Sequence, residues 1–106
     1  MGLRWHGTAV NAMDPARLGR WWAEVLRVGV LYERPDVVVL PGLTFVRVDD
    51  DVVPGRSRVH LELDSDDIAA DVEKLLDMGA RHVSSTSVEA VLADPEGNEF
   101  RVRPPR

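Results

Sequence analysis

Four side chains in the middle and near the end of this chain are of types that bind small molecules or transfer protons. His60 and Glu62 are two positions apart, and Glu99 and Arg101 have the same spacing. Residues two positions apart on a β-strand project to the same face. A guanidinium binds anionic groups, whereas glutamate and histidine exchange protons or bind metal ions. The alternate positions are apolar, as a face packed against a helix requires: Leu61, Leu63, Phe100 and Val102.

Composition and motifs exclude several other kinds of site. The chain has no cysteine, which removes disulfides, thiolate metal sites and cysteine nucleophiles. It has no Gly-x-Ser-x-Gly elbow, phosphate-binding loop or dinucleotide fingerprint. A net charge of −5 and an isoelectric point near 5.1 argue against nucleic-acid binding, which needs a dense basic surface. No apolar run approaches the length of a membrane span, so we expect a cytoplasmic protein without membrane or nucleic-acid partners.

A first amphipathic helix is predicted after the opening strand. Asp14 and Pro15 are typical of an N-cap and a first-turn proline, because proline lacks an N–H that would have no partner there. Gly29 is predicted to end the helix in the left-handed conformation. The apolar side chains between these ends recur at helical spacing: Leu18, Trp22, Val25 and Leu26.

A second helix repeats this pattern. Asp64 or Ser65 is predicted to cap it and Gly79 to end it, at an offset of 50 positions from Asp14 and Gly29. Its apolar stripe matches the first at the same offset: Ile68, Val72, Leu75 and Leu76. An internal repeat explains such a match. We therefore predict one domain, residues 1–106, that contains two copies of a unit, residues 1–52 and 53–106.

Extended segments surround both helices. One precedes each helix, at residues 3–10 and 57–63. Three follow the first helix, at 28–33, 37–40 and 43–48, and three follow the second, at 81–84, 88–93 and 99–103. The dipeptide Pro41-Gly42 and the tetrapeptide Asp-Pro-Glu-Gly at 94–97 are typical of turns. Each half therefore reads strand, helix and three strands, which is an α+β organisation.

This order of elements and several short sequence motifs resemble those of the vicinal-oxygen-chelate superfamily of glyoxalases, bleomycin-resistance proteins and dioxygenases. These motifs are Val-His-Leu-Glu-Leu at 59–63, Met-Gly-Ala-Arg at 78–81 and Asp-Pro-Glu-Gly-Asn at 94–98. In the first half, His6, Asp14-Pro15 and Trp21-Trp22 resemble the family's opening. The resemblance implies two βαβββ modules in tandem that form a curled mixed sheet around a cleft, with the helices packed on the outer face.

The resemblance also suggests which residues line that cleft. Metal enzymes of the family place one ligand on each of four strands, and the matching positions here are His6, His60, Val46 and Arg101. Valine offers no donor atom and a guanidinium repels a cation, so the usual metal site would be incomplete. Strand alternation adds further side chains to the expected lining, which then comprises His6, Thr8, His60, Glu62, Glu99 and Arg101.

The preferred reading is that the cleft binds a small organic molecule without the complete metal site. Arg101 would then pair with an anionic group, with Thr8 and Val46 as further contacts. A structural reading, in which these side chains are ordinary polar positions and the protein serves assembly, remains open. A homodimer is expected in either reading, because relatives with one pair of modules commonly complete their clefts by pairing subunits.

A metal-dependent enzyme is the alternative. His6 and His60 would hold a divalent ion (Ni, Co, Mn, Fe or Zn) together with a rearranged Glu62 or Glu99. The ion would polarise a substrate oxygen in a lyase, isomerase or dioxygenase reaction of the glyoxalase or dioxygenase type. The same two glutamates are the candidate catalytic residues for proton transfer without a metal. Whether the protein is an enzyme is left open by the sequence.

Overall fold

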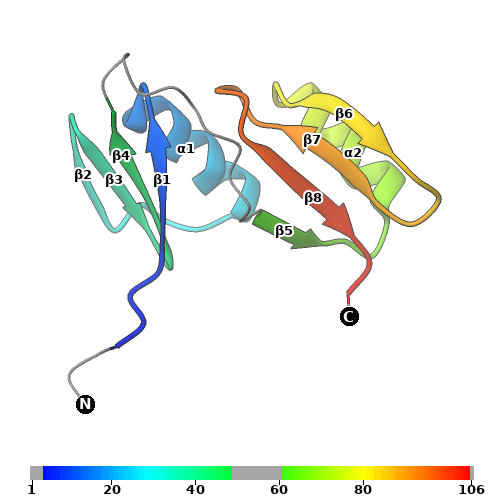
Figure 1. Cartoon of the computed structure of the whole chain (residues 1–106), viewed down its shortest axis with the longest axis horizontal. Helices are drawn as coiled ribbons and strands as arrows, with labels where there is room; N and C mark the ends of the chain where they lie inside the picture. Colours follow the sequence, from blue (N-terminus) through cyan, green and yellow to red (C-terminus); the bar gives the residue numbers. More distant parts are fainter. Residues whose placement is uncertain (1–3, 49–60, 106) are drawn as a thin grey trace. The chain divides into compact units, whose positions relative to one another are not determined.

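The computed structural model describes residues 4–48 and 61–105. The chain divides into two compact units, Met1–Val53 and Pro54–Arg106, which we call the first and second modules. Each module has the order strand, helix and three strands (Figure 1). The predicted α+β fold class with tandem βαβββ modules is thus confirmed. The strands form two four-stranded sheets, one in each module.

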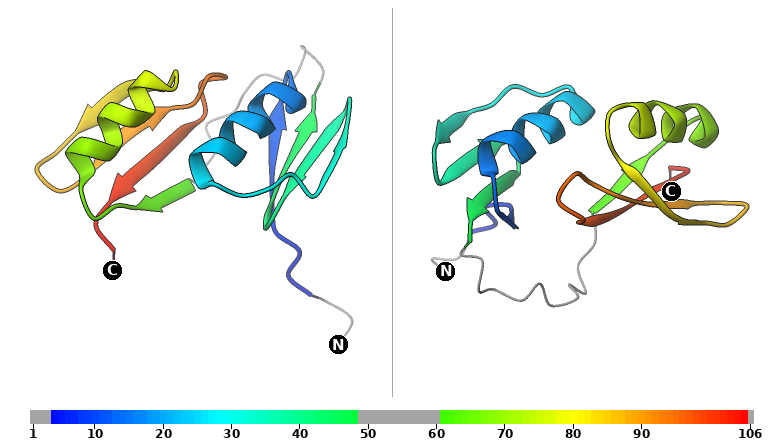
Figure 2. Two further views of the ribbon diagram at one scale, coloured as in Figure 1. Left: turned by 180° about the vertical axis from the view of Figure 1, so that it is seen from behind. Right: turned by 90° about the horizontal axis from the view of Figure 1, so that it is seen from above.

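The first module has the strand order β1-β4-β3-β2. Strands β1 and β4 are parallel, and the other neighbours are antiparallel. Helix α1 packs against β3 and β4, and it covers one face of the sheet (Figure 2). The elements are β1 (Thr8–Ala12), α1 (Pro15–Leu26), β2 (Tyr32–Arg34), β3 (Val37–Leu40) and β4 (Leu43–Arg47).

The second module repeats this topology. Its strand order is β5-β8-β7-β6, with β5 and β8 parallel and the remaining pairs antiparallel. Helix α2 packs against β8 and covers one face of its own sheet (Figure 2). The elements are β5 (Leu61–Asp64), α2 (Ile68–Asp77), β6 (Arg81–Ser85), β7 (Ala90–Ala93) and β8 (Glu99–Arg103).

The core of the first module lies between α1 and the sheet. Leu18 and Trp22 on the helix and Phe45 on β4 are almost completely buried. Gly19 brings the helix close to β3, because a Cβ atom at this position would lie 2.5 Å from Cγ1 of Val38. The second module buries Leu75 on α2 against a sheet face formed by Leu92, Phe100 and Val102. These faces fix which strand positions point away from the helices.

The first helix begins as predicted and ends earlier than predicted. The Asp14 side chain accepts a hydrogen bond of 3.2 Å from the backbone N–H of Arg17, and Pro15 is the first helical residue. Arg27, with φ of 55°, adopts the left-handed conformation expected of Gly29. The N–H of Val28 then bonds to the carbonyl of Ala23 at 3.0 Å, as in a Schellman motif. The prediction of Gly29 as the terminator is therefore wrong.

The second helix is capped by neither predicted residue. Asp67 is the N-cap and accepts from the N–H of Ala70 at 3.1 Å. Asp64 remains within β5, and Ser65 supports the start of the helix by donating its hydroxyl to Asp71 at 2.5 Å. Gly79, with φ of 107°, follows the last turn as predicted. The two N-caps, Asp14 and Asp67, are thus related by an offset of 53 and not by the predicted 50.

The predicted strands all exist where the structure describes them, with shifted ends. Strands β3 and β8 have the predicted bounds. Strand β1 begins only at Thr8 and β2 only at Tyr32, and the N–H of Val28, predicted to start that strand, instead bonds back to Ala23 in the capping motif of α1. Residues 57–60 of the predicted fifth strand lie outside the described residues. Within the described ranges, no helix is long and apolar enough to cross a membrane.

Candidate ligand-binding face

The second sheet presents a charged surface on the side that α2 does not cover, which we call the charged face. Phe100 and Val102 are buried toward α2, so Glu99, Arg101 and Arg103 project to the opposite side of β8. This alternation confirms the predicted common orientation of Glu99 and Arg101. The charged face comprises Glu62, Asp64, Arg81, Ser84, Glu89, Val91, Ala93, Glu99, Arg101 and Arg103.

Cross-strand register surrounds Arg101 with three defined neighbours. Glu62 on β5 lies opposite Arg101, and Val91 on β7 lies opposite it on the other side. Residues directly opposite one another on a sheet have Cβ atoms roughly 5 Å apart. An Nη1 atom of Arg101 also lies 3.7 Å from Oε1 of Glu89. Arg101 is therefore central to the charged face, with carboxylates on both sides.

The pairing of Arg101 with Glu89 is weak. Their side chains are 41% and 29% exposed, and their separation of 3.7 Å is long for a charge-assisted hydrogen bond. Exposed pairs of this kind stabilise a fold by only about 0–1 kcal/mol. The five N–H donors of a guanidinium also exceed what one carboxylate contact uses. Arg101 can therefore bind an additional anionic group without the loss of a strong internal interaction.

The turn before β8 sets the position of Glu99. Asp94 is completely buried, and its carboxylate accepts hydrogen bonds from the backbone N–H of Glu96 at 3.0 Å and of Asn98 at 2.9 Å. The side-chain amide of Asn98 donates to both Asp94 oxygens, at 3.1 and 2.9 Å. The sequence identified a turn here without predicting this buried carboxylate. These hydrogen bonds between Asp94 and Asn98 hold the backbone one residue before Glu99.

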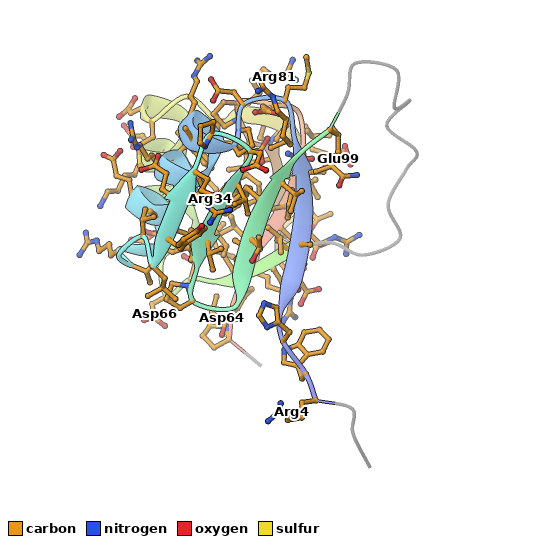
Figure 3. The ribbon with its side chains drawn as sticks, turned by 90° about the vertical axis from the view of Figure 1, so that its left-hand side faces the viewer. Arg4, Arg34, Asp64, Asp66, Arg81 and Glu99 are labelled. Carbon is orange, nitrogen blue, oxygen red and sulfur yellow. The ribbon has the colours of Figure 1, made fainter. Side chains whose placement is uncertain are left out.

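The corresponding side of the first sheet is less charged. Val46 lies there, opposite Val37 on β3 and Asn11 on β1, and 38% of its surface is exposed. Arg34 projects from the same side of β2, with its guanidinium carbon 5.2 Å from the ring centroid of Tyr32 (Figure 3). This side therefore offers mainly apolar and aromatic contacts.

Thr8 is not on that side of the first sheet. It lies opposite Leu43, which is buried toward α1, and it shares its strand face with Val10 and Ala12. Paired residues on neighbouring strands project to the same face, so the predicted orientation of Thr8 away from the helix is wrong. His6 precedes β1 and is exposed. His60 lies outside the described residues.

The match to known families rests on nearly the whole chain. The model of the glyoxalase-like domain covers residues 7–103. The chain belongs to the glyoxalase-like domain family. This assignment confirms the predicted membership of the glyoxalase, bleomycin-resistance and dioxygenase superfamily. A comparison with curated proteins finds no match.

Solved structures of glyoxalase-like proteins share this fold. A glyoxalase/bleomycin resistance protein/dioxygenase family enzyme from Burkholderia phytofirmans PsJN has 18% identity and a TM-score of 0.75, over 92% of this chain and 94% of its own. Glyoxalase I of Leishmania major has 17% identity and a TM-score of 0.73, over 97% and 87%. The fosfomycin resistance protein FosX of Listeria monocytogenes has 11% and 0.71, over 100% and 94%. Identities this low establish the fold alone.

The residues at the expected ligand positions of the glyoxalase-like family do not fit the usual divalent metal. Val46 has no donor atom, and Arg101 places a permanent cation where a carboxylate would stand. Within residues 4–48 and 61–105, no group of three or more His, Asp or Glu side chains is arranged to hold a metal ion. The arrangement around Arg101 is suited instead to binding an anionic group.

Sequence reasoning missed four charged residues of the charged face: Asp64, Arg81, Glu89 and Arg103. Glu89 contacts Arg101 although it precedes β7, and Arg103 lies opposite Asp64 at the far end of β8. Arg81 lies across Ala93 from Glu99. The alternation of β8 was a usable signal for Arg103, whereas Arg81 and Glu89 require the pairing register.

Proposed function

We propose that this protein binds a small organic molecule with an anionic group through Arg101 on the charged face, without the usual complete metal site. The observation that supports this proposal is the position of Arg101 at the centre of that face, between Glu62 and Val91. A guanidinium offers two parallel N–H donors to a carboxylate or phosphonate, which gives both affinity and orientation. Val91 supplies adjacent apolar surface for the organic part of the ligand.

The weak internal pairing of Arg101 supports the same proposal. Its contact with Glu89 is long and half exposed, so a ligand anion displaces little when it binds. Glu62 and Glu99 on the same face are the groups best placed to accept a proton from a bound molecule, should the protein be an enzyme. A second copy of the chain is an expected partner.

The test is a thermal-unfolding screen of chelator-treated protein against organic carboxylates, phosphonates and their neutral amides or esters. A ligand at a hundredfold excess over its dissociation constant stabilises the native state by about 2.7 kcal/mol. For a chain of this length that raises the melting temperature by on the order of 10 °C. We expect stabilisation by anionic members only. The shift should be lost in Arg101→Gln and kept in the matched control Arg17→Gln, which removes an exposed arginine of α1.

Two results would overturn the proposal. Equal stabilisation of the wild type and Arg101→Gln by the same anions would show that Arg101 does not bind them. Stabilisation by Ni²⁺, Co²⁺, Mn²⁺, Fe²⁺ or Zn²⁺ alone, lost in both His6→Ala and His60→Ala, would support the metal-dependent alternative instead. Melting temperatures are measured with each metal ion and with each organic anion separately, so that stabilisation by a metal is distinguished from stabilisation by an anion.

A further inference from the structure

We infer that the ligand of the charged face is a zwitterion, in which an ammonium group binds Glu99 while a carboxylate binds Arg101. This inference rests on the proposed function and adds the chemical class of the ligand. It follows from how positive and negative side chains lie side by side on the second sheet.

Opposite charges on this face are paired across the sheet, while β8 itself carries one carboxylate followed by two guanidiniums. Along β8, Glu99, Arg101 and Arg103 occupy successive positions of one face. Across the sheet, Glu62 lies opposite Arg101, and Asp64 lies opposite Arg103. Four carboxylates and three guanidiniums share the surface in total: Glu62, Asp64, Glu89 and Glu99 with Arg81, Arg101 and Arg103. A ligand with several negative charges would meet a carboxylate beside every guanidinium it contacted.

Glu99 is the carboxylate most available to a ligand cation. It is exposed, and within the described ranges no ion pair or side-chain hydrogen bond engages its carboxylate. Its α-carbon is separated from that of Arg101 by two residues of strand, about 7 Å. Flexible side chains can bring their charged ends closer than this. The spacing therefore suits a ligand whose two charges are separated by a few bonds.

The row of residues across the sheet at Glu99 contains a second charged side chain. Ala93 lies between Glu99 on β8 and Arg81 on β6, and its small side chain is 3% exposed. Figure 3 labels Arg81 and Glu99, the charged members of this row. Arg81, which lies across Ala93 from Glu99, disfavours a ligand that carries only positive charge.

The test compares four probes that differ in their charges: 6-aminohexanoate, norleucine, hexanoate and hexylamine. Binding to isotope-labelled full-length protein is measured from the amide chemical shifts of β8 at millimolar probe concentrations. At least one of the two zwitterions should bind on the order of tenfold more tightly than hexanoate, as expected for one added charge-assisted contact. Hexylamine should bind most weakly.

Two variants test whether Glu99 binds the ammonium group and Arg101 the carboxylate. Glu99→Gln should remove the advantage of the zwitterion and leave the affinity for hexanoate unchanged or slightly higher. The matched control Glu73→Gln, an exposed glutamate of α2, should change neither value. Arg101→Gln should weaken hexanoate and both zwitterions alike.

The outcomes separate this inference from the proposed function. If hexanoate binds in an Arg101-dependent way but neither amino group adds affinity, the anion site stands and the zwitterion is refuted. If the zwitterions bind better but Glu99→Gln changes nothing, the assignment of Glu99 is wrong. If no anion binds through Arg101, both proposals fail.

Discussion

Replacement of Gly19 by alanine should destabilise the protein, although alanine is the better helix former. The substitution gains up to about 1 kcal/mol from helix propensity. The new methyl group, however, would lie 2.5 Å from Cγ1 and 2.8 Å from Cβ of Val38, and 3.4 Å from Cδ2 of Phe45. Val38 is completely buried and β-branched, so its Cβ moves only if the backbone of β3 moves.

The steric term therefore exceeds the gain from helix propensity. Overpacking of a filled core costs about 1–3 kcal/mol and more where backbone must shift. We expect a net loss of about 2 kcal/mol, which lowers the melting temperature by roughly 8–16 °C. Thermal unfolding followed by circular dichroism measures this change. Gly29→Ala is the control, because nothing lies within 4 Å of its added Cβ and its φ is not positive.

A double-mutant cycle tests the cause of that loss. Val38→Ala removes Cγ1, the atom nearest to the new methyl group, so its cost should be smaller in the Gly19→Ala background than in the wild type. Coupled neighbours typically show an interaction energy of about 0.5–3 kcal/mol. If Gly19→Ala is as stable as the wild type, or if the two substitutions are additive, the close approach of α1 to β3 is not the reason for glycine here.

Three further substitutions probe the ends and the surface of the modules. Asp94→Ala should lower the free energy of unfolding by about 3 kcal/mol, because the half-buried backbone N–H groups of Glu96 and Asn98 lose their charged acceptor; an unchanged urea midpoint would contradict this. Arg27→Gly should raise the melting temperature slightly, since its left-handed φ of 55° costs about 1 kcal/mol with a side chain present; a lower melting temperature would argue against strain there. Glu33→Gln should change stability by less than about 1 kcal/mol, although Glu33 lies 2.9 Å from Arg20, because the two side chains are 33% and 67% exposed; a larger loss in denaturant titration would show a stronger pair.

The elements of this fold could be predicted where local chemistry determines them. Asp14 and Pro15 start α1 because their hydrogen-bonding requirements suit a helix N-terminus. The alternation on β8 correctly oriented Arg101, because Phe100 and Val102 must both be buried. In these places the local preference and the packed structure agree.

The misses arise where several residues compete for one structural role. Asp64, Ser65 and Asp67 can all cap a helix, and the choice depends on the sheet. Strand β5 keeps Asp64 opposite Arg103, and the N–H of Ser65 bonds to the carbonyl of Arg103 at 2.8 Å, so the helix can begin only afterwards. At the end of α1, glycine is favoured for the left-handed conformation, but Arg27 adopts it and Gly29 does not.

The orientation of the candidate site could be predicted only in part. Thr8 was assigned the wrong face because its orientation was taken from that of His6, which precedes the strand. The apolar positions Val10 and Ala12 carried the correct signal. Glu89 could not be placed from sequence, since its contact with Arg101 depends on how β7 is aligned with β8.

The parallel edge strands have a consequence for the order of folding. In the first module, β3 and β4 meet across a tight turn, with Leu40 opposite Leu43, whereas Thr8 of β1 reaches Leu43 only after the helix and two strands have intervened. Local contacts form at a lower cost in chain entropy than distant ones. We expect hairpins and helices to form first and the edge strands β1 and β5 to join last and detach first. Native-state hydrogen exchange should then show the amides of β1 exchanging at lower opening free energy than those of β3, and equal values would refute this order. Since Glu62 belongs to β5, partial unfolding would remove one wall of the candidate site while most of the second module remained folded.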